Sequence, residues 1–89
     1  MIFEWDEAKR RANLAKHGVD FDLVHAFEWG SAEIEPDRRR DYGENRWQAL
    51  GEINGHVYML IFTERHRAIR VISLRRANNK EKATYATAH

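Results

Sequence analysis

The hydrophobic and polar positions in the first third of the chain predict one strand followed by two helices. Residues 2–5 alternate in character, as a short strand does. A helix is expected over residues 7–17, because Asp6 is a good N-cap and Gly18 is a natural stop. A second helix is predicted to begin at Asp20. The side chains expected on its buried face are Leu23, Val24 and Phe27.

The hydrophobic period changes to two in the second half of the chain, which predicts strands. Two alternating runs, residues 46–53 and 56–64, flank Asn54 and Gly55. Asn-Gly between two such runs is the strongest short-range signal of a β-hairpin. A second turn at residues 64–67 leads into another alternating run. The three runs together predict an antiparallel meander.

The pattern at the end of the chain predicts a last helix and completes the expected fold. Asn78 is followed three residues later by Glu81, which is typical of a capping box at a helix start. Strands grouped after helices favour the α+β class. We therefore expect one domain over residues 1–89: a small antiparallel sheet, made of the three-stranded meander and the N-terminal strand, packed with helices.

A polar loop at residues 30–44 joins the predicted helices to the meander. It has room for a short edge strand at residues 32–35, which Pro36 would end because proline cannot continue a ladder of hydrogen bonds. The three arginines at residues 38–40 are expected to be solvated there.

Composition indicates a globular protein and excludes several classes. The chain is 43% hydrophobic and 33% charged and holds no cysteine, so it has no disulfide framework and no thiolate metal site. No apolar run approaches the roughly 20 residues that a membrane helix needs. We expect a soluble, cytoplasmic protein.

The net charge of +1 hides an uneven distribution. Residues 1–37 hold 4 Lys/Arg against 9 Asp/Glu, whereas residues 38–89 hold 11 against 5. A basic half can attract a polyanion and an acidic half a basic partner. Charge alone favours the simpler interpretation, in which opposite charges mix across the folded surface.

The sequence predicts neither a metal nor a cofactor. The five histidines form no pair four residues apart, and no glycine-rich phosphate loop or nucleophile elbow is present. The candidate chemistry is cationic instead: guanidinium groups offer a planar fork for phosphate oxygens, and imidazole titrates near neutrality. The cationic candidates are Lys16, His17, Arg46, Arg65, Arg70, Arg75 and Arg76.

Each cation also has a structural interpretation, which taken singly is the commoner one. Lys16 and His17 would complement the dipole at the end of the first helix. Arg70 would pair with a core carboxylate such as Glu81. The aromatic side chains could stack on bases, but so small a domain needs most of them for burial.

Three stretches of the chain together resemble the BrnT family of bacterial type II toxins, which are RelE-like ribonuclease toxins. They are "FEWDEAKRRANLAKHGVDF" at residues 3–21, "ENRWQALGEINGHVYMLIFTER" at 44–65 and "AIRVISLRRANNKEKATY" at 68–85. The third matches the family's ending at Arg70, Val71, Ile72, Ser73, Arg75, Ala77, Glu81 and Tyr85. The loop at residues 30–44, with its "DRRRD", is not part of the family pattern.

The resemblance implies a RelE-like fold and RNA cleavage that inhibits translation and growth. It also implies a BrnA-type antitoxin partner, a ribbon-helix-helix protein that would form a hetero-oligomer with the toxin and carry the contact with operator DNA. No membrane partner is expected.

RNA supplies its own nucleophile, the 2′-hydroxyl, so cleavage needs no metal if side chains move the protons and stabilise the phosphoryl charge. We expect Arg46, Arg65 and Arg75 on phosphate and Lys16 and His17 in proton transfer. Further RNA contacts are expected from Arg70 and Arg76, with His56 and His66 in reserve.

Two points stay open at this stage. Strict alternation along the last strand would place Arg70 on the face opposite Ser73 and Arg75. A non-catalytic interaction module, with its arginines paired internally, is the alternative function. A DNA-binding role is weaker, because neither a helix-turn-helix nor a strong basic stripe is evident.

Overall fold

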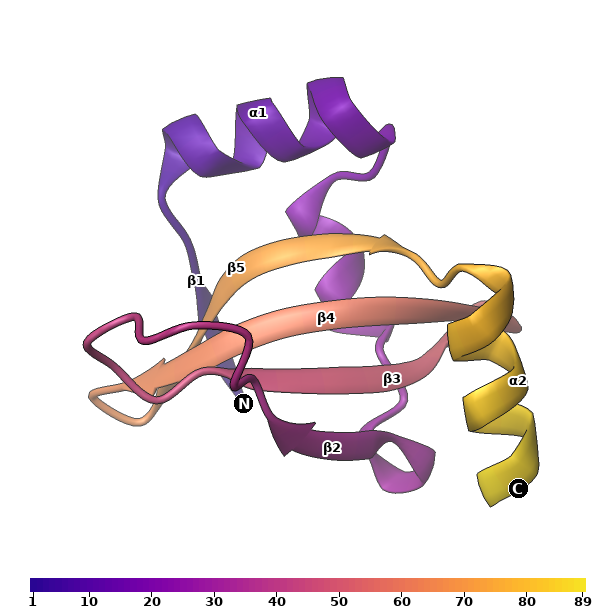
Figure 1. Ribbon diagram of the computed structural model, residues 1–89. Coiled ribbons are helices and arrows are strands. Elements are labelled where there is room, and N and C mark those ends of the chain that lie inside the picture. The colour runs from indigo at the N-terminus through magenta and orange to yellow at the C-terminus, as the bar shows by residue number, and fades with distance from the viewer.

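In the computed structural model, which describes residues 1–89, five strands form one sheet in the order β1-β5-β4-β3-β2 (Figure 1). The strands are β1 (Ile2–Glu4), β2 (Glu33–Pro36), β3 (Trp47–Ile53), β4 (His56–Arg65) and β5 (Ala68–Arg76). The helices are α1 (Glu7–His17) and α2 (Asn79–Ala88), with the 3₁₀ turns η1 (Phe21–Ala26) and η2 (Trp29–Ser31). The α+β class is confirmed. None of these helices has the length and apolar character needed to cross a membrane.

The expectation of a wholly antiparallel sheet is wrong in one respect and incomplete in another. The strands β3, β4 and β5 form the expected antiparallel meander, but β1 pairs with β5 in parallel, with Glu4 opposite Arg70. The segment α1, η1 and η2 carries the chain from β1 at one edge of the sheet to β2 at the other, and the two parallel strands β1 and β5 are joined only through the rest of the sheet. The edge strand β2 does form, and it ends at Pro36.

The second predicted helix is not an α-helix but the turns η1 and η2. Phe21, Val24 and Phe27 are all buried at a spacing of three residues. The 3₁₀ turn η1, with three residues per turn, points Phe21 and Val24 into the core, and Phe27 follows in extended backbone. Leu23, expected to be buried, is only partly so.

Capping and turn chemistry agree with the sequence elsewhere. The Asp6 side chain accepts from the backbone N–H of Lys9 at 3.0 Å, and Gly18 ends α1 in the left-handed region at φ 70°. Asn54 and Gly55 turn the first hairpin with φ 50° and 82°. The capping box at the start of α2 is present with both of its hydrogen bonds.

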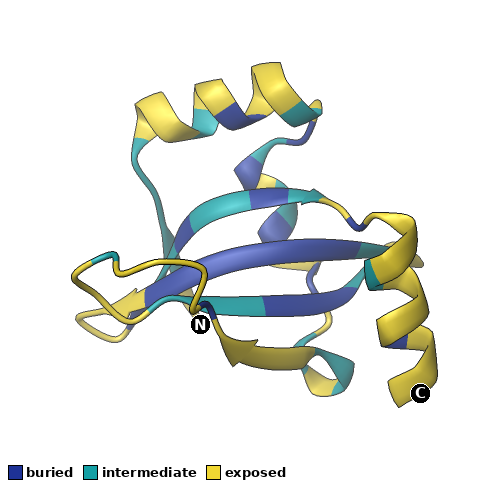
Figure 2. Ribbon diagram, in the orientation of Figure 1, coloured by how far each residue is buried: buried dark blue, intermediate teal, exposed yellow.

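The central strands are the most buried part of the sheet (Figure 2), and its two faces hold cores of different size. The face packed against η1 and η2, here the η face, holds the larger core: Val19, Phe21, Val24, Phe27, Ala49, Ile53, Tyr58, Leu60, Phe62, Val71 and Leu74. The face beneath α2, here the α2 face, has a smaller core of Leu50, Met59, Ile61, Ala77 and Tyr85. Figure 1 shows that α2 lies at only one end of the sheet, so much of the α2 face is not covered by a helix.

Asn13 fastens α1 to the open edge of β5. Strand β1 covers only residues 68–70 of β5, which leaves later backbone groups without a neighbouring strand. The buried Asn13 amide donates to the Leu74 carbonyl at 2.7 Å and accepts from the Leu74 N–H at 3.3 Å. It also donates to the Val19 carbonyl at 3.0 Å. These bonds bring the last turn of α1 to the edge of β5.

Candidate active site

A β-bulge in β5 changes which of its side chains share a face. Ile61 lies opposite Ser73 and Phe62 opposite Val71, so Ile72 has no partner in the register. The extra residue resets the alternation. Val71 and Leu74 both enter the η-face core as a result.

The same bulge places Arg70 and Arg75 on one face. Arg75 lies opposite Met59 of the α2-face core, and Arg70 lies opposite Thr63, four residues along β4 from Met59. Residues four apart on a strand point to the same face. The expectation that Arg70 points away from Arg75 is therefore wrong, because no sequence signal marks the bulge.

Glu81 fixes the guanidinium of Arg75 at the start of α2. Two parallel hydrogen bonds, of 2.7 and 2.8 Å, join Arg75 to the Glu81 carboxylate. Glu81 also accepts the N–H of Asn78, so it belongs to the capping box as well. These bonds lower the pKa of Glu81, with Arg75 as the largest cause, and raise that of Arg75.

Arg70 has a different partner from the one expected. Its Nη1 donates to the Glu4 carboxylate at 2.8 Å, and not to Glu81. Glu4 is the residue opposite Arg70 in the parallel β1–β5 pair. The predicted Arg70–Glu81 pair is wrong because the sequence pattern did not show that β1 joins the sheet beside β5.

Lys16 and His17 lie at the end of α1, on a groove against β5. The groove has a volume of about 230 Å³, and its lining includes Lys16, His17, Ile72 and Ser73. Burial is the main cause that lowers the pKa of His17, and the nearby positive charges of Lys16 and Arg75 lower it further. An imidazole with a pKa below its usual value is mostly uncharged at neutral pH and can accept a proton.

The loop after β2 adds an arginine that the sequence did not single out. The side chain of Asp37 is fully buried, and its oxygens accept from Nε and Nη2 of Arg39, both at 2.8 Å. Gln48 of β3 donates to the same carboxylate at 3.1 Å. The Arg39 bonds hold the pKa of Asp37 far below its usual range. The available signal was Asp37 directly after the strand-ending Pro36, but an Asp-x-Arg spacing is common in solvated loops.

Arg46 and Arg65 lie near the loop end of the sheet. Arg46 donates to the Glu44 carboxylate at 3.0 Å and lies 4.0 Å from the centre of the Tyr42 ring. Arg65 lies at the last position of β4 and lines a second groove, of about 450 Å³, which Glu44 also lines. These two arginines are thus neighbours of one loop rather than of His17.

Arg76 and the reserve histidines lie elsewhere. Arg76 contacts Nδ1 of His56 at 3.2 Å and lies 5.6 Å from the centre of the Tyr58 ring, a side chain of the η-face core. His66 occupies the turn between β4 and β5 with φ 52°. The structure therefore brings Lys16, His17 and Arg75 together and separates Arg76 and His56 from them.

Most aromatic side chains have structural roles. The three tryptophans pack against the η-face core, and Tyr58 and Tyr85 are buried. Tyr42, in the loop, contacts the guanidinium groups of Arg40 and Arg46. No group of three or more His, Asp or Glu side chains is arranged to hold a metal ion.

The whole-chain comparison gives the class of the protein. Residues 5–81 match the model of a family of ribonuclease toxins of type II toxin-antitoxin systems. That family is BrnT, and the chain belongs to it. The matched range includes Lys16, His17 and Arg75, and family membership implies an RNA substrate and an antitoxin partner. No curated protein matches the chain.

Proposed function

We propose that this toxin is a metal-independent endoribonuclease with its catalytic site on the α2 face. The observation that carries the proposal is that Lys16 and His17 line one groove against β5 and that Arg75 is near enough for its charge to act on His17, so that burial and positive charge favour an uncharged imidazole. A neutral base beside fixed cations is what cleavage by the RNA 2′-hydroxyl requires. Arg46, Arg65 and Arg70 would contact the flanking RNA from the same sheet.

The proposed reaction assigns one task to each side chain. His17 accepts the proton of the 2′-hydroxyl, and the 2′-oxygen attacks the adjacent phosphorus. Arg75 stabilises the charge that develops on the phosphoryl oxygens. The bond to the 5′-oxygen breaks as Lys16 gives it a proton, which leaves a 2′,3′-cyclic phosphate and a free 5′-hydroxyl.

The ion pair of Arg75 is compatible with this role. Its hydrogen bonds to Glu81 and to the Arg76 carbonyl engage both N–H groups of Nη1 and one of Nη2. The Nε–H and one N–H of Nη2 stay unengaged, and the side chain is 27% exposed. A guanidinium held by a carboxylate loses little freedom when it binds phosphate.

We further propose that RNA cleavage inhibits translation and growth, and that a BrnA-type antitoxin neutralises the toxin in a hetero-oligomer. The family match over residues 5–81 supports this part of the proposal. Operator DNA would be bound through the antitoxin. A RelE-like fold and a cytoplasmic location belong to the same proposal.

The test is cleavage of a single-stranded RNA by the purified chain in the presence of EDTA. We expect products that end in 2′,3′-cyclic phosphate, and no cleavage when the nucleotide at the cut carries a 2′-deoxy sugar. His17→Ala and Arg75→Ala should each lower kcat by roughly 10²-fold or more. Arg11→Ala, which removes an exposed cation of α1, is the control that should leave cleavage unchanged. Intact RNA at high enzyme concentration, or cleavage abolished by EDTA, would overturn the proposal.

A non-catalytic interaction module is the second candidate, and one observation favours it. Five arginines have acidic partners within the chain: Arg10, Arg39, Arg46, Arg70 and Arg75. If these pairs served stability alone, Arg75→Ala would lower the unfolding temperature and the unsubstituted chain would leave RNA intact. If the unsubstituted chain cleaves RNA and a folded Arg75→Ala variant does not, the enzyme hypothesis is supported over the interaction module.

A further inference from the structure

We propose that Arg39, held by Asp37, is a second phosphate-binding position on the α2 face, for a phosphodiester of the bound RNA strand next to the one that is cut. This inference rests on the proposed function, since it assumes that RNA crosses the α2 face. It concerns Asp37 and Arg39, in the loop between β2 and β3.

Asp37 is a buried carboxylate that accepts most of its hydrogen bonds from one arginine. Its side chain has no exposed surface, and its own N–H donates to the Arg46 carbonyl at 2.8 Å, which extends the β2–β3 pairing by one residue. Burial of a carboxylate is costly unless it is paired and hydrogen-bonded. Arg39 supplies three of its bonds, two from the guanidinium and one from the backbone N–H at 3.3 Å, and Gln48 supplies the fourth.

The Arg39 side chain is nevertheless more than half exposed to solvent. Asp37 takes the Nε–H and one N–H of Nη2, and Tyr42 lies close enough to the guanidinium to raise its pKa further. The side chain is 58% exposed although it is anchored at two points. An anchored, exposed fork is suited to a phosphate, because little side-chain freedom remains to be lost on binding.

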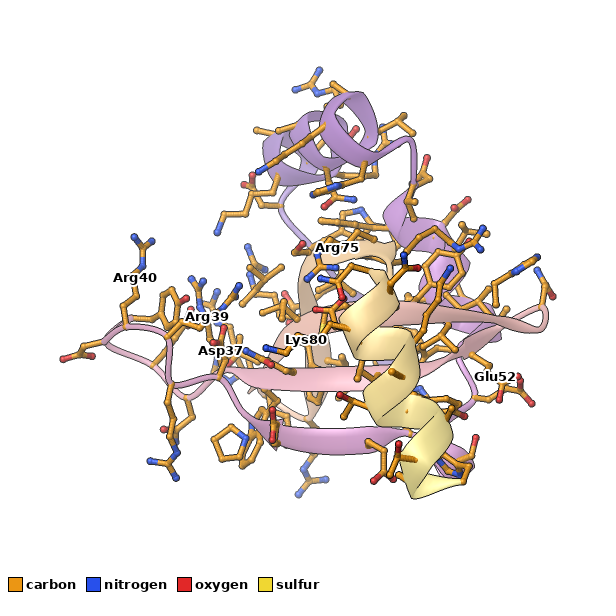
Figure 3. The ribbon with its side chains drawn as sticks, turned by 45° about the vertical axis from the view of Figure 1, so that its right-hand side comes forward. Asp37, Arg39, Arg40, Glu52, Arg75 and Lys80 are labelled. Carbon is orange, nitrogen blue, oxygen red and sulfur yellow. The ribbon has the colours of Figure 1, made fainter.

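Arg39 lies on the same face as the proposed catalytic residues. Gln48, which shares Asp37, lies opposite Ile61, and Ile61 lies opposite Ser73 of β5. Neighbouring strands are about 4.8 Å apart, so this anchor lies on the order of 10 Å from β5. In Figure 3 Arg75 lies beside the start of α2, and Arg39 lies farther toward the loop, with Lys80 between them. The charge of Arg39 also acts on Arg75 and Glu81, the pair at the start of α2.

The neighbouring arginine provides a contrast within the same loop. Arg40 is exposed and lies 5.0 Å from the centre of the Tyr42 ring, with no carboxylate partner. In Figure 3 it points away from α2, at the outer side of the loop. Single-stranded nucleic acids are bound by cations that follow the backbone along a groove. The charge of Arg39 acts on Arg75 and Glu81, whereas Arg40 shares the Tyr42 ring with Arg46.

The test measures binding of a single-stranded DNA oligonucleotide, which lacks the 2′-hydroxyl and so is not cleaved, by fluorescence anisotropy at several salt concentrations. Arg39→Ala should weaken binding about tenfold and lower the salt slope by about 0.7, the value for one phosphate contact on a single strand. Arg40→Ala, the matched control, should change binding less than twofold. Asp37→Asn should weaken binding in the same direction, because Arg39 then loses its charged anchor.

Cleavage of the RNA separates this inference from the proposed function. For Arg39→Ala we expect a raised KM with kcat nearly unchanged, which a merely structural role would not give. Where Arg39→Ala does not fold, Arg39→Gln keeps an N–H donor for Asp37 and removes the charge. Equal effects of Arg39→Ala and Arg40→Ala on binding would overturn the inference and leave the proposed function standing. Oligonucleotide binding that depends on Arg39, with RNA intact, would overturn the proposed function and leave the phosphate position standing.

Discussion

The two faces of the sheet differ in the kind of residue they hold: the η face is mainly apolar, and the α2 face holds paired charges. The η face buries eleven residues, all of them hydrophobic, under η1 and η2. The α2 face buries five and has a row of arginines outside them, each of four held by an acidic side chain. Apolar burial dominates the stability of a domain of this size. The η face therefore carries most of the stability, which leaves the α2 face free to hold charge.

The two faces also differ in how well their buried polar groups are hydrogen-bonded. On the η face the indole N–H of Trp29 is buried without a hydrogen-bond partner. On the α2 face Asp37, Glu81 and Tyr85 are all hydrogen-bonded, and the Tyr85 hydroxyl donates to the Glu52 carboxylate at 2.8 Å. Hydrogen-bonded side chains keep fixed positions that apolar packing alone does not define. The side chains held in place by hydrogen bonds thus lie mainly on the face proposed to act on RNA.

The largest expected effect is a loss of stability, and it is tested at two neighbouring residues of β4 that point to opposite faces of the sheet. Leu60 is fully buried in the η face, and Met59, 6% exposed, lines an open groove on the α2 face. Leu60→Ala should lower the free energy of unfolding by about 4 kcal/mol, and Met59→Ala by about 2, because an open site relaxes or hydrates more easily than a closed one. Urea titration followed by circular dichroism measures both. Equal losses would show that the two faces contribute alike.

Gly51 gives the next effect, again on the η face. A Cβ at this position would lie 2.4 Å from Cζ of Phe27, closer than side-chain atoms approach. Gly51→Ala should therefore cost about 1–3 kcal/mol of stability through overpacking. Thermal unfolding measures the loss, and Phe27→Leu in the same chain should recover part of it. A neutral Gly51→Ala variant would mean that the aromatic cluster of the η face is loosely packed.

The parts of the fold that depend on local signals could be predicted from the sequence. The cap at Asp6, the stop at Gly18, the Asn54-Gly55 turn and the capping box at Asn78 each need only a few adjacent residues, and all are present. The parallel pairing of β1 could not be predicted, because it depends on contacts between distant parts of the chain. The same dependence on distant contacts hid the Glu4 partner of Arg70.

The candidate site was harder to predict than the fold for a related reason. Residue type singles out Lys16, His17 and Arg75, but it is the packing of α1 against β5, fastened by the Asn13 bonds to Leu74, that brings them together. The shared face of Arg70 and Arg75 depends on one extra residue, Ile72, that no pattern marks. Arg39 resembled its two neighbours in sequence, and only the burial of Asp37 distinguishes it.

A smaller effect concerns acid stability, which the carboxylates of the α2 face should control. The pKa values of Asp37 and Glu81 are lowered in the folded protein, chiefly by their hydrogen bonds to Arg39 and Arg75 respectively. A lowered folded pKa stabilises the protein above the unfolded pKa, near 4, and the stabilisation is lost as pH falls through the folded value. Glu81→Gln should cost about 1–2 kcal/mol at pH 7. Its stability curve, measured by urea titration from pH 7 to 2, should converge with that of the parent chain in acid; a gap that stays constant would contradict the assignment.

The smallest expected effect is a change in the pKa of His17, which can be measured without any assay of catalysis. Removing the positive charge of the adjacent residue in Lys16→Met should raise the pKa of His17, since that charge is one of the causes that lower it. Because burial is the largest cause, the pKa should still stay below its usual value near 6.5. NMR titration of the imidazole Cε1–H resonance measures the shift, with Arg11→Met as the control cation on the same helix. An unchanged His17 titration in Lys16→Met would mean that Lys16 does not influence the proposed base, and the electrostatic part of the mechanism would then rest on Arg75 alone.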